Sequence, residues 1–229
     1  MRASIDTDVI IHLYSSQKEV LLYKMFDDVY MYEFLYEREL KRKSPSVFKR
    51  FSSDLMKKEC HHCRIHIIKT KDLVEMGIKG LFEKYLRDYD ILFDRGELFA
   101  VSLAKAMGLL AFVSDDTKEF GPHETLLKEL IEGVIPFAFY ELLFLKYLSQ
   151  EASVSDIHVE FDEVINKSMS ERPMQFKSRM MRTVRRFSKN YGTIRDVKWL
   201  STYCVDNQID YRAKMIELKQ YLKKIDKLN

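Results

Sequence analysis

The stretch DRGELFAVSLAKAMGLLAFVSDD, residues 94–116, holds the most informative pattern in the chain. Residues 95–97 begin an apolar, helix-like pattern that we expect to end at Gly108, since glycine commonly terminates helices. Residues 109–113 are wholly apolar and predict a short buried strand, which ends at Ser114-Asp115-Asp116. A helix followed directly by a buried strand is typical of α/β folds with a parallel sheet.

Other segments of the first 150 residues repeat this alternation. Short runs rich in β-branched, apolar and aromatic residues predict four more strands, and charged amphipathic patterns predict helices between them. We therefore expect an α/β fold: a three-layer α/β/α sandwich with a mostly parallel central sheet. The predicted strands are 2–6, 29–32, 64–68 and 134–138, and the helices include 33–43 and 80–90.

The last third of the chain has a different character. From about Phe139 the pattern is predominantly helical, with a very apolar segment at 140–148 and a long charged helix expected at 206–228. We predict two parts, a nuclease-like domain at 1–150 and a basic α-helical C-terminal extension at 151–229. The aromatic and aliphatic residues of 137–147 indicate core, or a homodimer surface, rather than a cofactor pocket.

Composition limits the classes of protein. Hydrophobic residues make up 46% and charged residues 32%, and no apolar run approaches the length of a membrane span, so we expect no membrane partner. The first residues lack the apolar stretch of a secretory signal, and three cysteines cannot form an even disulfide framework. Both features favour a cytoplasmic location. A net charge of +3 does not by itself indicate a polyanion partner.

Acidic residues stand at the predicted ends of several elements. Asp6, Asp8, Glu97, Asp115 and Asp116 would repel one another if the fold brought them together without a cation. Mg²⁺ and Mn²⁺ prefer such oxygen ligands, and a bound metal lowers the pKa of its water enough to attack a phosphodiester. Each acid alone is also an ordinary helix-capping residue. Together they predict a Mg²⁺ or Mn²⁺ site.

Four motifs give the chain a resemblance to the PIN-domain nucleases. Residues 5–11 (IDTDVII) resemble the family's opening strand, and 96–104 (GELFAVSLA) resemble its Gly-Glu helix. Residues 112–116 (FVSDD) resemble its acidic strand end, and 133–137 (GVIPF) its closing strand. The four occur in the family's order over residues 1–150. The segment 41–90 is longer and more basic than in compact members of the family.

The resemblance implies roles for individual acids. Asp6, Glu97 and Asp116 correspond to the metal-binding catalytic acids, with Asp8 and Asp115 as additional ligands. The family places a further acid in the helix after the second strand, which is Glu39 here, or Glu37 if the helical register differs. Glu119 is either the last acid of the site or a surface residue.

The C-terminal part contains a concentrated run of positive charge. Residues 167–198 hold ten basic and two acidic side chains, which gives a local charge of +8. Helically spaced guanidinium groups with interleaved aromatics suit a nucleic-acid backbone, although a solvated face or an acidic partner would explain the run too. The candidate nucleic-acid residues are Lys177, Arg179, Arg182, Arg185, Arg186 and Lys189.

A second metal motif is incomplete. Cys60 and Cys63 enclose two histidines and have His66 nearby, but no second Cys-x-x-Cys exists. We therefore expect small buried cysteines rather than a zinc site at Cys60 and Cys63.

These observations predict a Mg²⁺/Mn²⁺-dependent endoribonuclease, with RNA favoured over DNA through the resemblance alone. Toxin-type or defence-type members of the family add an antitoxin-like protein partner as an expectation. The alternatives are a catalytically silent PIN-like interaction module and a metal nuclease that acts on DNA.

Overall fold

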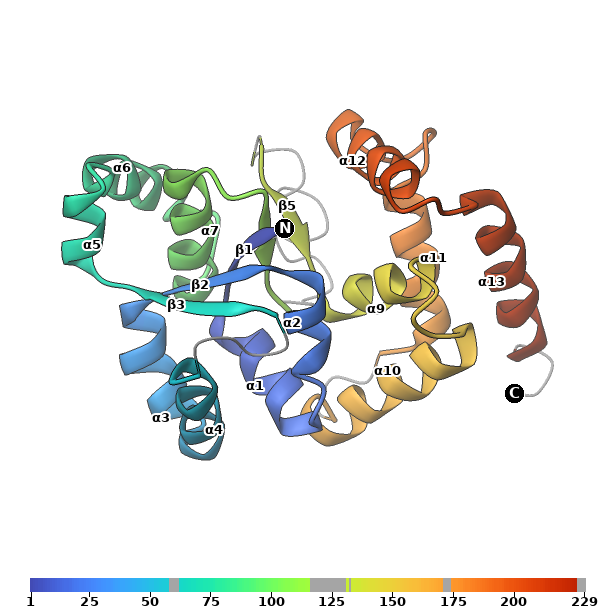
Figure 1. Ribbon diagram of the computed structural model, residues 1–229, viewed down its shortest axis with the longest axis horizontal. Coiled ribbons are helices and arrows are strands. Elements are labelled where there is room, and N and C mark those ends of the chain that lie inside the picture. The colour runs from blue at the N-terminus through green and yellow to red at the C-terminus, as the bar shows by residue number, and fades with distance from the viewer. Residues whose placement is uncertain (58–61, 116–130, 132, 171–173, 226–229) are drawn as a thin grey trace. The chain divides into compact units, whose positions relative to one another are not determined.

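The structure is a computed structural model of the 229-residue chain and describes residues 1–57, 62–115, 131, 133–170 and 174–225. The chain forms two compact units, Met1–Phe139 and Tyr140–Asn229. Figure 1 shows an α/β first unit and a helical second unit. The sequence places the boundary at residue 150, whereas the contacts place it at the start of the apolar helix α9 (Phe139–Leu148).

The first unit alternates strands and helices as expected. Its strands are β1 (Arg2–Ile5), β2 (Asp28–Tyr32), β3 (Arg64–Ile68), β4 (Ala111–Val113) and β5 (Ile135–Phe137). Its helices are α1 (Thr7–Ser16), α2 (Val20–Met25), the π-helical turn η1 (Leu35–Leu40), α3 (Lys41–Lys43), α4 (Pro45–Leu55), α5 (Thr70–Glu75), α6 (Lys79–Tyr89) and α7 (Arg95–Met107).

The central sheet is parallel throughout. Among the described residues five strands pair in the order β3-β2-β1-β4-β5. Ile5 pairs with Val113 and Val113 with Phe137, so β1, β4 and β5 end at the same edge. The α/β prediction and the five predicted strands are confirmed within a few residues. The order reverses at β1, because β2 lies on one side of it and β4 on the other.

Helices cover both faces of the sheet, in agreement with a three-layer sandwich. On one face α7 packs against β1, β2 and β4, and Ser4 Oγ donates to Ala100 O at 2.7 Å. Helix α6 packs on α7, and Figure 1 shows α1 and α4 on the opposite side of the sheet. Gly108 ends α7 with a φ of 61°, as the sequence predicts. Pro45 begins α4 at its first turn, where proline costs no helical hydrogen bond.

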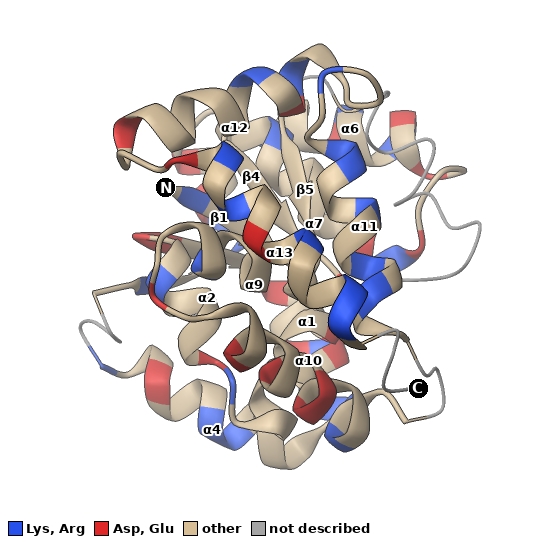
Figure 2. Ribbon diagram, turned by 90° about the vertical axis from the view of Figure 1, so that its right-hand side faces the viewer, with Lys and Arg blue, Asp and Glu red and all other residues tan. Residues whose placement is uncertain are grey.

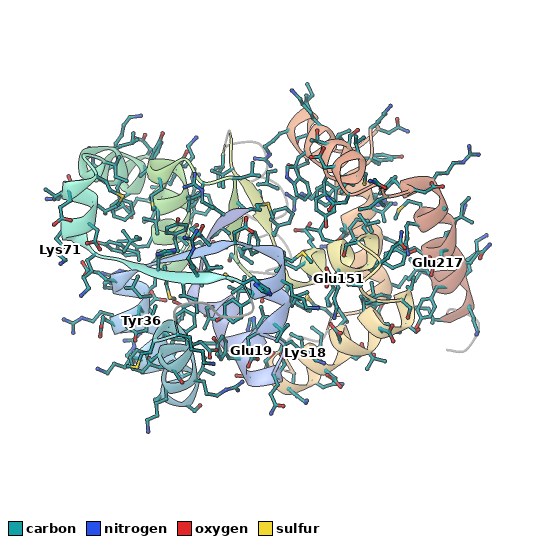
Figure 3. All side chains as sticks on the ribbon, viewed as in Figure 1. Lys18, Glu19, Tyr36, Lys71, Glu151 and Glu217 are labelled. Carbon is teal, nitrogen blue, oxygen red and sulfur yellow. The ribbon has the colours of Figure 1, made fainter. Side chains whose placement is uncertain are left out.

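The second unit is a helical bundle around α9. Its other helices are α10 (Val154–Ser168), α11 (Phe176–Arg186), α12 (Ile194–Asp206) and α13 (Tyr211–Ile225). Phe144 and Tyr147 are fully buried, and Phe144 stacks on Phe187 with ring centroids 6.4 Å apart. Tyr147 donates to Glu217 of α13, labelled in Figure 3, at 3.0 Å. These contacts with α11 and α13 explain why α9 belongs to the second unit, and they confirm the apolar segment as core.

The helix predicted at 206–228 begins later than expected, because a turn precedes it. Helix α12 ends at Asp206, and Gln208 adopts the left-handed conformation with a φ of 54°. Ile209 N then donates to Cys204 O at 2.8 Å, and α13 begins only at Tyr211. No helix among the described residues has the length and apolarity needed to cross a membrane.

Candidate active site at the carboxyl ends of β1 and β4

Asp6 follows β1 directly, at the edge where β1 and β4 both end. Its backbone N donates to Val113 O at 2.9 Å, which continues the sheet by one bond. In open parallel sheets ligands bind outside the carboxyl ends of the strands, at the point where the strand order reverses. That point lies between β1 and β4, so the fold places Asp6 where a ligand site is expected.

The Asp6 side chain is buried and also caps a helix. Only 3% of the residue is exposed, and its Oδ1 accepts a hydrogen bond from Thr7 N at 2.6 Å at the start of α1. A Cβ added at Gly96 would lie 2.6 Å from this same Oδ1. Glycine at position 96 is therefore required for Asp6 to lie against the first turn of α7.

Glu97 reaches the same place from the first turn of α7. It is fully buried, and its backbone N donates to the capping Asp94 side chain at 3.1 Å. Ser114, at the end of β4, has its Oγ 3.3 Å from Glu97 Oε1 and 3.4 Å from Asp6 Oδ2. A hydroxyl has one proton and can donate to only one of these carboxylates at a time. The Ser114 hydroxyl thus lies between the carboxylates of Asp6 and Glu97, which repel each other.

Glu39 completes the group from a third element. It lies on the π-helical turn η1 and is 8% exposed, and its Oε2 lies 3.5 Å from the Cβ position at Gly96. Glu37, two residues earlier, is exposed. The structure therefore places Glu39, and not Glu37, beside Asp6. Single π-turns within helices are frequent at functional sites, and this one sets the register of Glu39.

Asp6, Asp8, Glu39 and Glu97 form what we call the acid cluster. Burial, followed by the negative charges of Asp8, Glu97 and Asp94, raises the pKa of Asp6 well above its ordinary value, against the Thr7 hydrogen bond. Each charge that the fold brings in makes ionisation of Asp6 harder. A divalent cation would remove this penalty, which is the physical basis for a metal site here.

Lys43 is a cation beside the cluster that the sequence reasoning did not identify. Its Nζ lies 3.1 Å from Asp8 Oδ1 and 3.4 Å from Glu39 Oε2. Burial opposes its charge, but Asp8, Glu39 and Asp6 raise its pKa. The spacing of four residues between Glu39 and Lys43 was the available signal. Because the Lys43 side chain is 40% exposed, it could move aside for a metal ion that needs the same oxygens.

Asp115 is held by other groups of the protein. Its Oδ1 accepts from Phe139 N at 2.8 Å, and its Oδ2 lies 3.1 Å from His12 Nδ1. These contacts tie the end of β4 to Phe139, the last residue of the first unit, and to α1, which is a positioning role. The predicted ligand Asp116 and the candidate acid Glu119 lie outside the described residues.

The donor set fits a hard cation in part. Asp6, Glu39 and Glu97 offer buried carboxylate oxygens, the ligand type that Mg²⁺ and Mn²⁺ prefer. The described residues contain no group of three acidic, histidine or cysteine side chains already arranged around one metal position. Closure of the cluster on an ion therefore requires side-chain movement, a ligand beyond the described residues, or both.

The predicted nucleic-acid residues of α11 divide into two sets. Arg186 is 5% exposed, with its Nε 2.7 Å from Asp196 Oδ2 and its Nη1 2.6 Å from Glu141 Oε2. Arg179 is 8% exposed and lies over Tyr140, 5.5 Å from the ring centroid. Both arginines are thus buried and engaged by groups of the protein. The remaining predicted residues are exposed or half-buried: Lys177, Arg182, Arg185 and Lys189.

The cysteine motif has no zinc geometry in the part that the structure describes. Cys63 is buried, and its Sγ donates to Arg64 O at 3.7 Å. His66 Nε2 lies 2.7 Å from Asp28 Oδ1, so this imidazole already has a carboxylate partner. Cys60 lies outside the described residues.

Comparison of the chain with models of protein families, with curated proteins and with solved structures found no match. The fold and the acid cluster are therefore the features from which a function is inferred.

Proposed function

We propose that the first unit is a PIN-like nuclease that hydrolyses RNA phosphodiester bonds with Mg²⁺ or Mn²⁺ bound at the acid cluster. One observation carries the proposal: buried carboxylates from three separate elements lie near Gly96 and Ser114, where the strand order reverses, namely those of Asp6, Glu39 and Glu97. Proteins avoid burying acids together unless a cation or a proton compensates them. Catalysis is a strong reason to keep such an arrangement.

Each acid has a distinct part in this proposal. Asp6 and Glu97, which share the Ser114 hydroxyl, hold the metal ion, and Asp116 supplies a further ligand. A bound ion of this kind provides an activated water for attack on phosphorus. Glu39 would orient the attacking water, and Asp115 fixes the end of β4 through Phe139 N.

Substrate contact outside the acid cluster falls to exposed or half-buried cations. Lys and Arg of α11 are marked in Figure 2, and those not used in the core are Lys177, Arg182, Arg185 and Lys189. They suit contacts with phosphate, whose energy depends on salt and not on sequence.

The test compares cleavage of a labelled single-stranded RNA and a DNA of the same sequence, with Mg²⁺, with Mn²⁺ and with EDTA. We expect RNA cleavage only with metal, and at least a ~100-fold loss in Asp6→Asn, Glu97→Gln and Glu39→Gln. Glu37→Gln is the matched control, because it makes the same change on the same π-turn at an exposed position. Its activity should equal that of the wild type.

Three outcomes would replace the proposal. Cleavage in EDTA would show that the reaction needs no metal ion. Preferential cleavage of the DNA would indicate a DNA-acting nuclease. Intact RNA and DNA under all metal conditions would indicate a silent interaction module. If the protein is of the toxin type, its expression should arrest growth, and Asp6→Asn should relieve the arrest.

A further inference from the structure

A pocket of about 630 Å³ lies beside the start of α7, on the side of α6. It is within the size range of small-ligand sites. Its apolar walls carry two arginines and one acid, and the lining residues are Leu86, Arg87, Asp90, Phe93, Arg95, Leu98 and Phe99. None of these residues belongs to the acid cluster.

Arg95 is an exposed cation that lines this pocket and lies over two aromatic rings. Its guanidinium carbon lies 4.2 Å from the centroid of the Phe34 ring and 6.0 Å from that of Phe99. Stacking on an aromatic face orients the guanidinium plane and leaves its N–H groups directed outward. No carboxylate of the described residues forms an ion pair with Arg95 or Arg87. The pocket therefore presents positive charge without a described counter-charge on either arginine.

The pocket adjoins the acid cluster along one helix. Arg95 immediately precedes Gly96, against which Asp6 and Glu39 lie, and Glu97 follows. Successive residues of an α-helix rise by only about 1.5 Å, so Arg95 and Glu97 share the first turn of α7, while Asp6 and Glu39 lie against Gly96 between them. A cluster of carboxylates repels phosphate, whereas adjacent arginines attract it.

We propose that this pocket binds the nucleotide next to the scissile phosphate of a single-stranded RNA. Arg95 and Arg87 contact the phosphate oxygens, and the base lies against the apolar walls at Phe93 and Leu98. Single strands are bound in this way, through cations for the backbone and apolar or aromatic surfaces for the bases. The inference rests on the proposed function, because it takes the acid cluster as the point of cleavage.

Binding is measured in EDTA, so that cleavage does not interfere. The full chain is titrated into a fluorescently labelled single-stranded RNA, and anisotropy is followed at several salt concentrations. Arg95→Ala should weaken binding about 10-fold and reduce the slope of log K against log salt by about 0.7, the value for one contact with a single strand. Arg95→Lys should keep the slope but recover only part of the affinity, because it lacks the planar stack.

The control is Arg2→Ala, which removes the same charge from an exposed position at the opposite end of β1. It should leave affinity and slope unchanged. Arg95→Ala should also melt as the wild type does, since its position in the first helical turn suits alanine. With metal present, it should raise KM and leave kcat nearly unchanged, as expected for a binding contact.

The two proposals fail separately. If Arg95→Ala binds RNA as tightly as the wild type while the wild type cleaves with metal, the pocket assignment is overturned and the nuclease stands. If RNA binding depends on Arg95 but no metal gives cleavage, the nuclease and the placement next to a scissile phosphate are overturned, and only RNA binding at the pocket stands.

Discussion

Asp6 combines two tasks that make opposite demands on one carboxylate. Through Oδ1 it accepts from Thr7 N and caps α1, and through Oδ2 it lies near Ser114 and Glu97. The cap favours a charged group, whereas burial among other acids disfavours it, and the balance raises the pKa of Asp6. The residue is a local cost to stability in the absence of a cation.

Replacement of Asp6 should therefore stabilise the metal-free protein. Asp6→Asn keeps an oxygen for Thr7 N but removes the buried charge, and we expect its free energy of unfolding in EDTA to rise by about 1 kcal/mol. Urea unfolding with and without Mg²⁺ measures the change. Mg²⁺ should stabilise the wild type and leave Asp6→Asn unaffected. A lower stability of Asp6→Asn in EDTA would show that the carboxylate is already compensated by the protein.

At the scale of elements, the sequence was most informative where several signals agreed. Residues 94–116 combine a capping acid, a glycine stop and an apolar strand, and α7 and β4 follow that pattern closely. The break at 207–210 lacks such a signal, because Gln208 takes the left-handed position that glycine or asparagine usually marks. The π-turn at 35–40 could not be predicted either, since the sequence pattern there is that of an ordinary charged α-helix.

Two glycines at the same helical position give a matched test of the α7 packing. Gly96 and Gly80 each occupy the second residue of a helix, but only the Cβ of an alanine at 96 would meet an atom, Asp6 Oδ1, at 2.6 Å. Gly80→Ala should therefore stabilise by up to about 1 kcal/mol through helix propensity. Gly96→Ala should destabilise by about 1–3 kcal/mol and lose nuclease activity. Equal thermal shifts in the two variants would mean that Asp6 does not lie against α7.

For the whole molecule, the fold class could be predicted from the alternation of strands and helices along the chain. The proximity of the acids could not, because it depends on tertiary structure. Strand order brings residue 6 beside residue 114, and nothing in the spacing of the acids specifies that order. The sequence also left open whether Glu39 or Glu37 lies in the site, and the register of the π-turn buries Glu39. The charge run at 167–198 gives no sign that Arg186 and Arg179 are buried, because the sequence does not show which arginines have partners inside the protein.

The buried ion network predicts how the second unit responds to acid. Burial opposes ionisation of Asp196, but Arg186 and Arg195 outweigh it and lower its pKa. A lowered pKa in the folded state adds stability that is complete above the unfolded value of about 3.9 and is lost as the pH falls through the folded value. The second unit should therefore weaken as the pH falls below about 4.

Fluorescence of Trp199 can follow this transition, because it is the only tryptophan in the sequence. Its ring centroid lies 5.9 Å from that of Phe187 in the second unit. Asp196→Asn should lower the free energy of unfolding near pH 7 by about 2–3 kcal/mol, since Arg186 loses a charged partner. The stability of this variant should also depend on pH much less than that of the wild type below about pH 4. An unchanged acid transition in this variant would place the responsible carboxyl elsewhere.

The position of β1 has a consequence for how the protein is made. This strand leaves the ribosome about a hundred residues before β4, the neighbour with which it forms the crevice, and β5 follows β4. Asp6 and Glu39 are therefore synthesised well before Glu97 and Ser114, the residues that lie against Asp6 in the folded unit. Under the proposed function, the first unit becomes able to cut only after the residues as far as β5 have been made.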